Sequence, residues 1–152
     1  MKIKFLISFL LAVFHLESTT LQELKDKGNV FEAGLLLSSL DNGIHYLEST
    51  DNIQRHLLLG IHGGGSLGYE WVYPLSSLDS PSNLVSYFKW SPLVLNCLTE
   101  DAQFLINFLE TQGQNFESIT ILGHSLGGVL LGKVLESVNT KVPIKAHIIA
   151  SP

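Results

Sequence analysis

Cysteine is almost absent from this sequence. The single thiol, Cys97, lies in an apolar run that covers residues 93–98. One cysteine excludes a disulfide within the chain, and the apolar setting favours a buried, unreactive thiol over a nucleophile or a metal ligand. No group of cysteines and histidines has the spacing of a metal site, so the sequence predicts no bound metal.

Basic residues are also scarce. The chain has nine lysines and arginines against fourteen aspartates and glutamates, and its net charge is −5. The basic residues are scattered along the chain and form no patch, which argues against a nucleic-acid partner. No glycine-rich loop carries the lysine that a phosphate-binding loop requires.

Long hydrophobic runs are missing, and the only candidate lies near the N-terminus, where Lys2 and Lys4 precede residues 5–14. That run is too short to cross a bilayer comfortably, so no stable membrane span is expected. Basic residues ahead of a short apolar run are typical of an export signal. Residues 1–20 are therefore predicted to be a signal peptide, and the protein to be secreted or periplasmic. No clear cleavage motif follows, and an apolar N-terminal helix that stays attached is the alternative.

Apolar residues make up 45% of the 152 residues, enough for one domain with a core but not for two. Short apolar runs and one amphipathic segment predict the regular elements of this domain. The expected strands cover 55–61, 84–89, 119–122 and 144–150, and the amphipathic helix covers 99–110.

The segment before these strands is ambiguous. Residues 35–39 and 44–48 are joined by Asp41-Asn42-Gly43, a turn sequence typical of a β-hairpin. Two hairpin strands are therefore expected. A helix over residues 31–40 is the alternative, because Phe31, Leu35 and Leu36 also fit helical spacing.

The most informative stretch covers residues 118–138 and reads SITILGHSLGGVLLGKVLESV. A β-branched apolar run is followed by a glycine-rich break and then by apolar residues at helical spacing, so the chain is expected to turn from strand into helix at Ser125. A serine nucleophile needs a base beside it and main-chain donors that face the oxyanion. A tight turn of this kind exposes a hydroxyl beside the first amides of a helix. Glycines at 123 and 127 remove side chains that would clash there. Ser125 is thus a candidate nucleophile, and a helix-capping serine is the alternative.

A second glycine-rich segment, His62-Gly63-Gly64-Gly65-Ser66, follows the expected strand 55–61 directly. Three glycines allow the backbone to approach a ligand closely and leave its N–H groups accessible. The alternative is a glycine-rich turn that binds nothing.

The two segments together, HGGG followed later by GHSLGG, resemble the lipase, esterase and thioesterase branch of the α/β-hydrolases. The resemblance covers residues 35–152. It implies an α/β fold with a mostly parallel sheet flanked by helices, here without the C-terminal strands of the family. Residues 21–152 would then form a partial α/β-hydrolase domain.

The resemblance also implies a chemistry. Ser125 would be the nucleophile, and the amides of Leu126 and of Gly64, with Gly65 as a close substitute, would form the oxyanion hole. The substrate would be a small-molecule or lipid ester or thioester, cleaved without a cofactor. The remaining motif residues that would shape the site are His62, Gly63, Gly123, His124, Gly127 and Gly128.

The sequence departs from the family pattern after the nucleophile, where the family carries a carboxylate and then a histidine. Only Glu136, inside the expected helix, and His147, inside an expected strand, follow Ser125. Both are expected to be structural. His62 and His124 are interpreted as parts of their loops, and His45 and His56 as packing or surface residues.

Two hypotheses remain, and a third comes from another class of protein. The chain is either a truncated serine hydrolase that lacks the triad acid and histidine and is nearly inactive alone, or a degenerate relative that binds acyl or carbonyl ligands. The third is a structural module that uses its glycine-rich loops only as turns. The intact oxyanion segments favour the truncated hydrolase.

Overall fold

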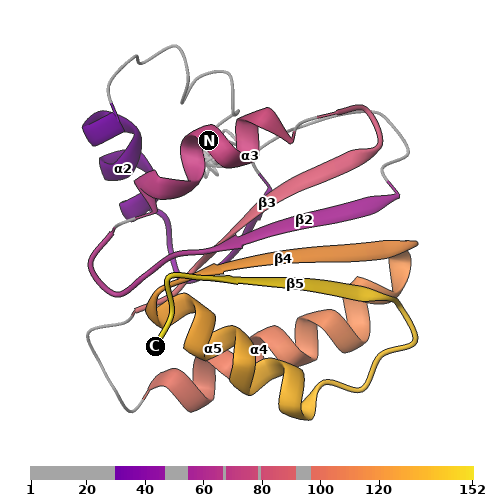
Figure 1. Ribbon diagram of the computed structural model, residues 1–152. Coiled ribbons are helices and arrows are strands. Elements are labelled where there is room, and N and C mark those ends of the chain that lie inside the picture. The colour runs from indigo at the N-terminus through magenta and orange to yellow at the C-terminus, as the bar shows by residue number, and fades with distance from the viewer. Residues whose placement is uncertain (1–29, 47–54, 67, 79, 92–96) are drawn as a thin grey trace, which may run out of the picture.

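The computed structural model describes residues 30–46, 55–66, 68–78, 80–91 and 97–152 (Figure 1). The signal peptide expected over residues 1–20 lies outside these ranges, and so does the side chain of Cys97, for which burial was expected.

Within these ranges the chain forms five strands and six helical segments. The strands are β1 (Gly43–Tyr46), β2 (His56–Ile61), β3 (Asn83–Lys89), β4 (Ser118–His124) and β5 (Ile144–Ile149). The helices are α2 (Val30–Ser38), η1 (Tyr69–Trp71), α3 (Val72–Ser77), α4 (Cys97–Thr111), η2 (Gln112–Asn115) and α5 (Leu126–Ser137).

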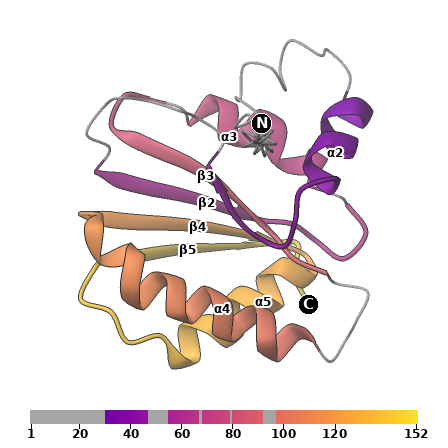
Figure 2. The same ribbon diagram turned by 180° about the vertical axis from the view of Figure 1, so that it is seen from behind.

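The strands form one sheet in the order β1-β3-β2-β4-β5. β1 runs antiparallel to β3, and all other neighbours are parallel. Helices α2 and α3 lie on one face, and α4 and α5 lie on the other (Figures 1 and 2). The expected α/β fold, a mostly parallel sheet flanked by helices, is therefore confirmed.

Each face of the sheet has its own core, because neighbouring strand residues point to opposite faces. In β2, Leu57, Leu59 and Ile61 belong to the core under α4 and α5, whereas Leu58 belongs to the core under α2 and α3. All four are buried. A strand that is apolar on both faces is typical of the interior of a parallel sheet.

Within the described ranges, the region expected to form a hairpin differs from the first expectation. Residues Val30–Ser38 form helix α2, so the alternative, a helix over this segment, is confirmed and the strand at 35–39 is wrong. Ala33 and Leu37, one helical turn apart, are 0% and 1% exposed and pack into the core with Trp71. Burial of this helical pair outweighs the turn signal. β1 does form next to it, but it pairs with β3.

The topology places the two glycine-rich segments side by side. β2 and β4 are parallel neighbours, with Ile61 opposite Gly123, so the residues after both strands leave the sheet at the same end. From β2 the chain continues through α3 to β3 on one side, and from β4 through α5 to β5 on the other. Ligands of open α/β sheets bind at such a point, where the connections diverge from the carboxyl ends of two adjacent strands.

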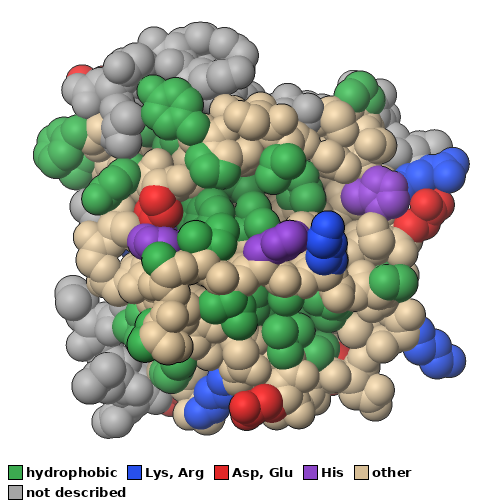
Figure 3. All heavy atoms as spheres, viewed as in Figure 1, with side chains coloured by type: hydrophobic (Ala, Val, Ile, Leu, Met, Phe, Trp, Pro, Cys, Tyr) green, Lys and Arg blue, Asp and Glu red, His purple; other side chains and the backbone are tan. Residues whose placement is uncertain are grey.

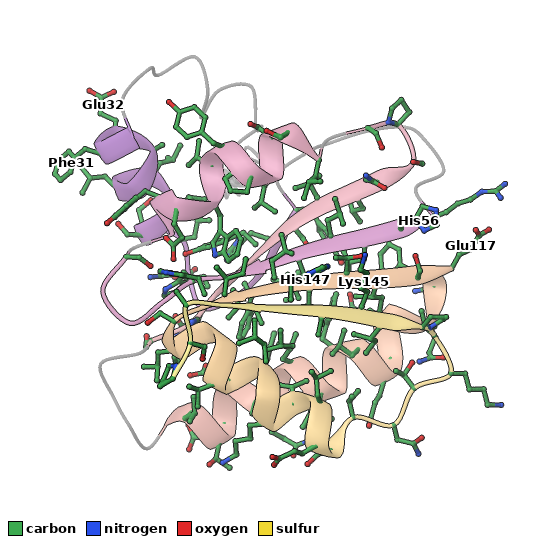
Figure 4. The ribbon with its side chains drawn as sticks, in the orientation of Figure 1. Phe31, Glu32, His56, Glu117, Lys145 and His147 are labelled. Carbon is green, nitrogen blue, oxygen red and sulfur yellow. The ribbon has the colours of Figure 1, made fainter. Side chains whose placement is uncertain are left out.

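β5 forms one edge of the sheet, and five of its six residues are exposed. Ile148 and Ile149 are 52% and 45% exposed. Lys145 and His147 lie next to each other on this strand (Figure 4), and hydrophobic side chains gather between α3 and β5 over the middle of the sheet (Figure 3).

Among the described helices, none has the length and apolar character needed to cross a membrane.

Candidate active site

Ser125 occupies a strained turn between β4 and α5. Its backbone angles are φ 51° and ψ −122°, in a left-handed region that favours glycine. The backbone holds this conformation at both ends: Ser125 N donates to Ile149 O at 2.9 Å, and Gly128 N donates to Ser125 O at 2.9 Å. Strain kept at one residue by its surroundings is a feature of functional sites.

The hydroxyl of Ser125 is uncommitted. Ser125 precedes helix α5 at the N-cap position, but its side chain makes no capping hydrogen bond. The interpretation as a helix-capping serine is therefore wrong. The residue is partly exposed, and Oγ makes no hydrogen bond with any other described residue. A free hydroxyl at a strand-to-helix turn is the arrangement that a serine nucleophile requires.

Glycines allow α5 to begin directly against the sheet. A Cβ on Gly123 would lie 2.8 Å from Gly127 O, and one on Gly127 would lie 2.5 Å from His62 O. Both distances are far shorter than a carbon-to-oxygen contact allows, so backbone packs on backbone at these positions. Gly128 is equally confined, because a Cβ there would lie 2.7 Å from Ser151 Cβ. The structure thus gives a steric reason for each of the three glycines.

The loop after β2 contacts this turn. A Cβ placed on Gly63 would lie 3.1 Å from Ser125 Cβ and 3.1 Å from His124 Nδ1. The amide of Gly63 is already engaged, because it donates to Ser66 Oγ at 3.1 Å and to Glu70 Oε1 at 3.0 Å. The amides of Gly64 and Gly65 have no acceptor in the described part of the chain. They are therefore the donors of this loop that a ligand could use.

Leu126 supplies a matching donor from the other bend. It is the first residue of α5, where the N–H groups of a helix have no partner inside the helix. Its amide makes no hydrogen bond to another described residue. The two bends that meet at Ser125 thus each carry amides without an acceptor among the described residues, and amides that face one oxygen stabilise negative charge on it.

His62 has a structural role. It is 1% exposed, and its ring stacks on Tyr87 and packs against Trp90. In the neutral ring Nδ1 donates to Gly63 O at 2.7 Å and Nε2 accepts from Trp90 N at 3.4 Å, while the Trp90 indole N–H donates to His62 O at 3.0 Å. Both ring nitrogens are thus occupied. The residue ties the ends of β2 and β3 together, as expected for a loop residue.

The burial of His62 makes stability depend on pH. Burial lowers the pKa of His62 below its ordinary value of 6.5. The unfolded state therefore binds a proton that the folded state refuses, and stability contributed by the neutral ring is lost as pH falls below about 6.5. We expect the free energy of unfolding in urea to decrease between pH 7.5 and pH 5.5. This dependence should weaken in His62→Gln and persist in His45→Gln, and an equal dependence in both variants would contradict the assignment.

Glu70 is the residue of this site that the sequence did not reveal. Its Oε1 accepts hydrogen bonds from Gly63 N, from Ser66 Oγ and from His124 Nδ1, the last at 3.1 Å. The carboxylate therefore joins the loop after β2 to the residue next to Ser125. Position 70 lies between two aromatic residues and carries no motif, so only the folded chain shows this role.

The other histidines and the carboxylates do not complete a triad among the described residues. No described histidine is hydrogen-bonded to Ser125 Oγ. His56 bonds Ser118 Oγ at 2.6 Å, and both His56 and Glu117 lie at the far end of the sheet (Figure 4). His147 lies on the exposed edge strand, and Glu136 on the exposed surface of α5. Within the described ranges, no three His, Cys, Asp or Glu side chains gather as a metal site would need.

Comparison with known proteins returns no match: no protein-family model, no curated protein and no solved structure matches the chain. Any assignment of function therefore depends on the geometry around Ser125.

Proposed function

We propose that this chain is a serine hydrolase of the α/β-hydrolase type, which cleaves ester or thioester bonds through an acyl-enzyme on Ser125. The observation that carries the proposal is the meeting of two bends at the carboxyl ends of β2 and β4. One presents a strained serine with an uncommitted hydroxyl. The other brings Gly63 against that serine and leaves the amides of the next two residues, Gly64 and Gly65, without an acceptor in the described part of the chain.

The chemistry follows from these groups. Ser125 Oγ attacks the carbonyl carbon of the substrate, and a new C–O bond forms as the proton of the hydroxyl passes to a base. The amides of Leu126 and of Gly64 or Gly65 stabilise the oxyanion of the tetrahedral intermediate. The intermediate expels the alcohol or thiol, and water then releases the acid from Ser125.

The base is the part that the described residues do not supply, because no described histidine bonds to Ser125 Oγ. On this proposal the described residues do not include the histidine and carboxylate of the triad, and the 152-residue chain alone hydrolyses its substrate very slowly. An enzyme that has the serine and its oxyanion donors but lacks the base still hydrolyses its substrate about 10³–10⁴-fold faster than the uncatalysed reaction in water. A small-molecule or lipid ester would be the substrate, and an exported enzyme would meet it outside the cytoplasm.

A tagged fluorophosphonate tests the proposal. Ser125 Oγ would form a bond to phosphorus, fluoride would leave, and the hydroxyl proton would pass to added imidazole. We expect slow labelling that imidazole accelerates, because free imidazole replaces the missing base. Tandem mass spectrometry should place the label on Ser125 in the folded chain, and urea should abolish this selectivity.

Two results would count against the proposal. Labelling spread evenly over the serines, with or without imidazole, would show that Ser125 is not activated and that the glycine-rich loops are only turns. Binding of an aryl trifluoromethyl ketone without any labelling of Ser125 would favour the alternative, a degenerate relative that binds carbonyl ligands.

A further inference from the structure

A single carboxylate oxygen joins the two bends of the candidate site. Glu70 Oε1 accepts from Gly63 N at 3.0 Å and from Ser66 Oγ in the loop after β2. It also lies 3.1 Å from His124 Nδ1, in the residue that precedes Ser125. Among the described residues no other hydrogen bond is found between this loop and the strand-to-helix turn, so Glu70 is placed to set how the two face each other.

The setting of Glu70 is not that of a surface carboxylate. Its side chain is 17% exposed, and the imidazole of His124 is 32% exposed. Its second oxygen, Oε2, is buried without a hydrogen-bond partner among the described residues. Burying a carboxylate oxygen in this way is unfavourable unless strong bonds elsewhere on the group compensate. Three donors on Oε1 provide that compensation, and two of them come from the loop that the proposed reaction needs.

The charge of Glu70 also affects the pKa values of Tyr87 and His62, two buried residues near the loop. Burial raises the pKa of Tyr87, and the nearby charge of Glu70 adds to the effect. The same charge partly opposes the effect of burial on His62. A Cβ on Gly68 would lie 2.3 Å from the Tyr87 hydroxyl oxygen, so only glycine lets the chain pass this ring and bring Glu70 back toward Gly63.

We propose that Glu70 is a positioning residue for the oxyanion hole. Together with Ser66 Oγ it accepts the Gly63 N–H, which removes that amide from the site and leaves those of Gly64 and Gly65 as the donors of the loop. By accepting from His124 Nδ1 it holds the same loop against the turn that carries Ser125. The inference rests on the proposed function, because oxyanion donors matter only if Ser125 reacts.

Glu70→Gln tests this role, since it keeps the size of the side chain and removes its charge. Glu110→Gln is the matched control: Glu110 Oε1 also accepts a backbone N–H, from Asn139 at 2.7 Å, but on an exposed surface distant from the site. Three measurements apply to both variants of the full chain. They are hydrogen exchange of the Gly63 amide, the position of the imidazole proton of His124 from ¹⁵N NMR, and the rate of imidazole-assisted labelling of Ser125.

In Glu70→Gln we expect the Gly63 amide to exchange faster, and the His124 proton to move from Nδ1 toward Nε2. The labelling rate should fall about tenfold to hundredfold, the range expected when reacting groups are misplaced by about 1 Å. Glu110→Gln should change none of the three. Glu70→Asp keeps the charge and should recover part of the labelling rate, which a purely structural loss would not explain.

Two outcomes would overturn the inference and one would affect the proposed function instead. Unchanged exchange and an unchanged imidazole proton in Glu70→Gln would show that Glu70 does not hold the loop. Changed NMR signals with an unchanged labelling rate would show that it holds the loop without positioning the donors. Absence of labelling in the unsubstituted chain would overturn the proposed function. Hydrogen exchange of the Gly63 amide and the position of the His124 imidazole proton would then decide whether Glu70 joins the two bends.

Discussion

Ser125→Gly is expected to abolish labelling by a fluorophosphonate and, at the same time, to raise the free energy of unfolding by about 1 kcal/mol. Ser125 adopts φ 51° and ψ −122°, which strains any residue with a Cβ. Relief of such strain stabilises the fold by about 1–3 kcal/mol. The greater conformational freedom of glycine in the unfolded chain offsets about 0.5–1 kcal/mol of that gain. No hydrogen bond of Oγ within the described residues is lost by the change.

Ser125→Ala is the control for this prediction. It also removes the nucleophile, but it keeps the Cβ and therefore the strained backbone. Labelling should be lost in both variants, whereas only the glycine variant should unfold at a higher urea concentration. If Ser125→Gly were less stable than Ser125→Ala, the turn would not be strained, and the steric case for a functional serine would weaken.

Gly127→Ala is expected to destabilise the fold by about 3 kcal/mol, near the upper end of the cost of overpacking a core. The added Cβ would lie 2.5 Å from His62 O and 2.7 Å from Ile61 O. Both are backbone atoms at the end of β2, so no side-chain rotation can relieve the contact, and α5 must move away from the sheet. Because the same contact sets the distance between the two bends, imidazole-assisted labelling of Ser125 should also fall.

Gly132→Ala is the matched control in the same helix, because a Cβ there meets nothing within 4 Å. Alanine is the better helix former, so this variant should gain about 0.5–1 kcal/mol. Urea unfolding of both variants measures the difference. Equal stability of the two would mean that α5 does not pack on the end of β2 as the structure has it.

The sequence was sufficient to predict the elements whose signal is local. The apolar runs of β2 and β4 identify interior strands, and the glycines between 123 and 128 identify a close approach of helix and sheet. The sequence of helix α2 is compatible with two structures, because the hydrophobic residues of 30–38 fit a helix or a strand. Burial of Ala33 and Leu37 against Trp71, which is distant in sequence, decides for the helix.

The supports of the site could not be predicted, because they depend on contacts between remote residues. Glu70 is 54 positions from His124, and His62 is 28 positions from Trp90. No periodicity or motif links such pairs. The proposed nucleophile and its proposed donors belong to short motifs, and the residues that hold those motifs together become visible only once the chain is folded.

In the described part of the chain no strand pairs with the outer edge of β5, and this has a consequence for behaviour in solution. Its six residues, IKAHII, carry one positive charge, and most of their side chains are exposed beside a row of backbone groups open to pairing. Exposed segments of this length and composition can pair with the same segment of other molecules and stack into cross-β fibrils. We therefore expect self-association through this edge to increase with protein concentration and storage time, and Lys145 is the charged residue of the strand that opposes it.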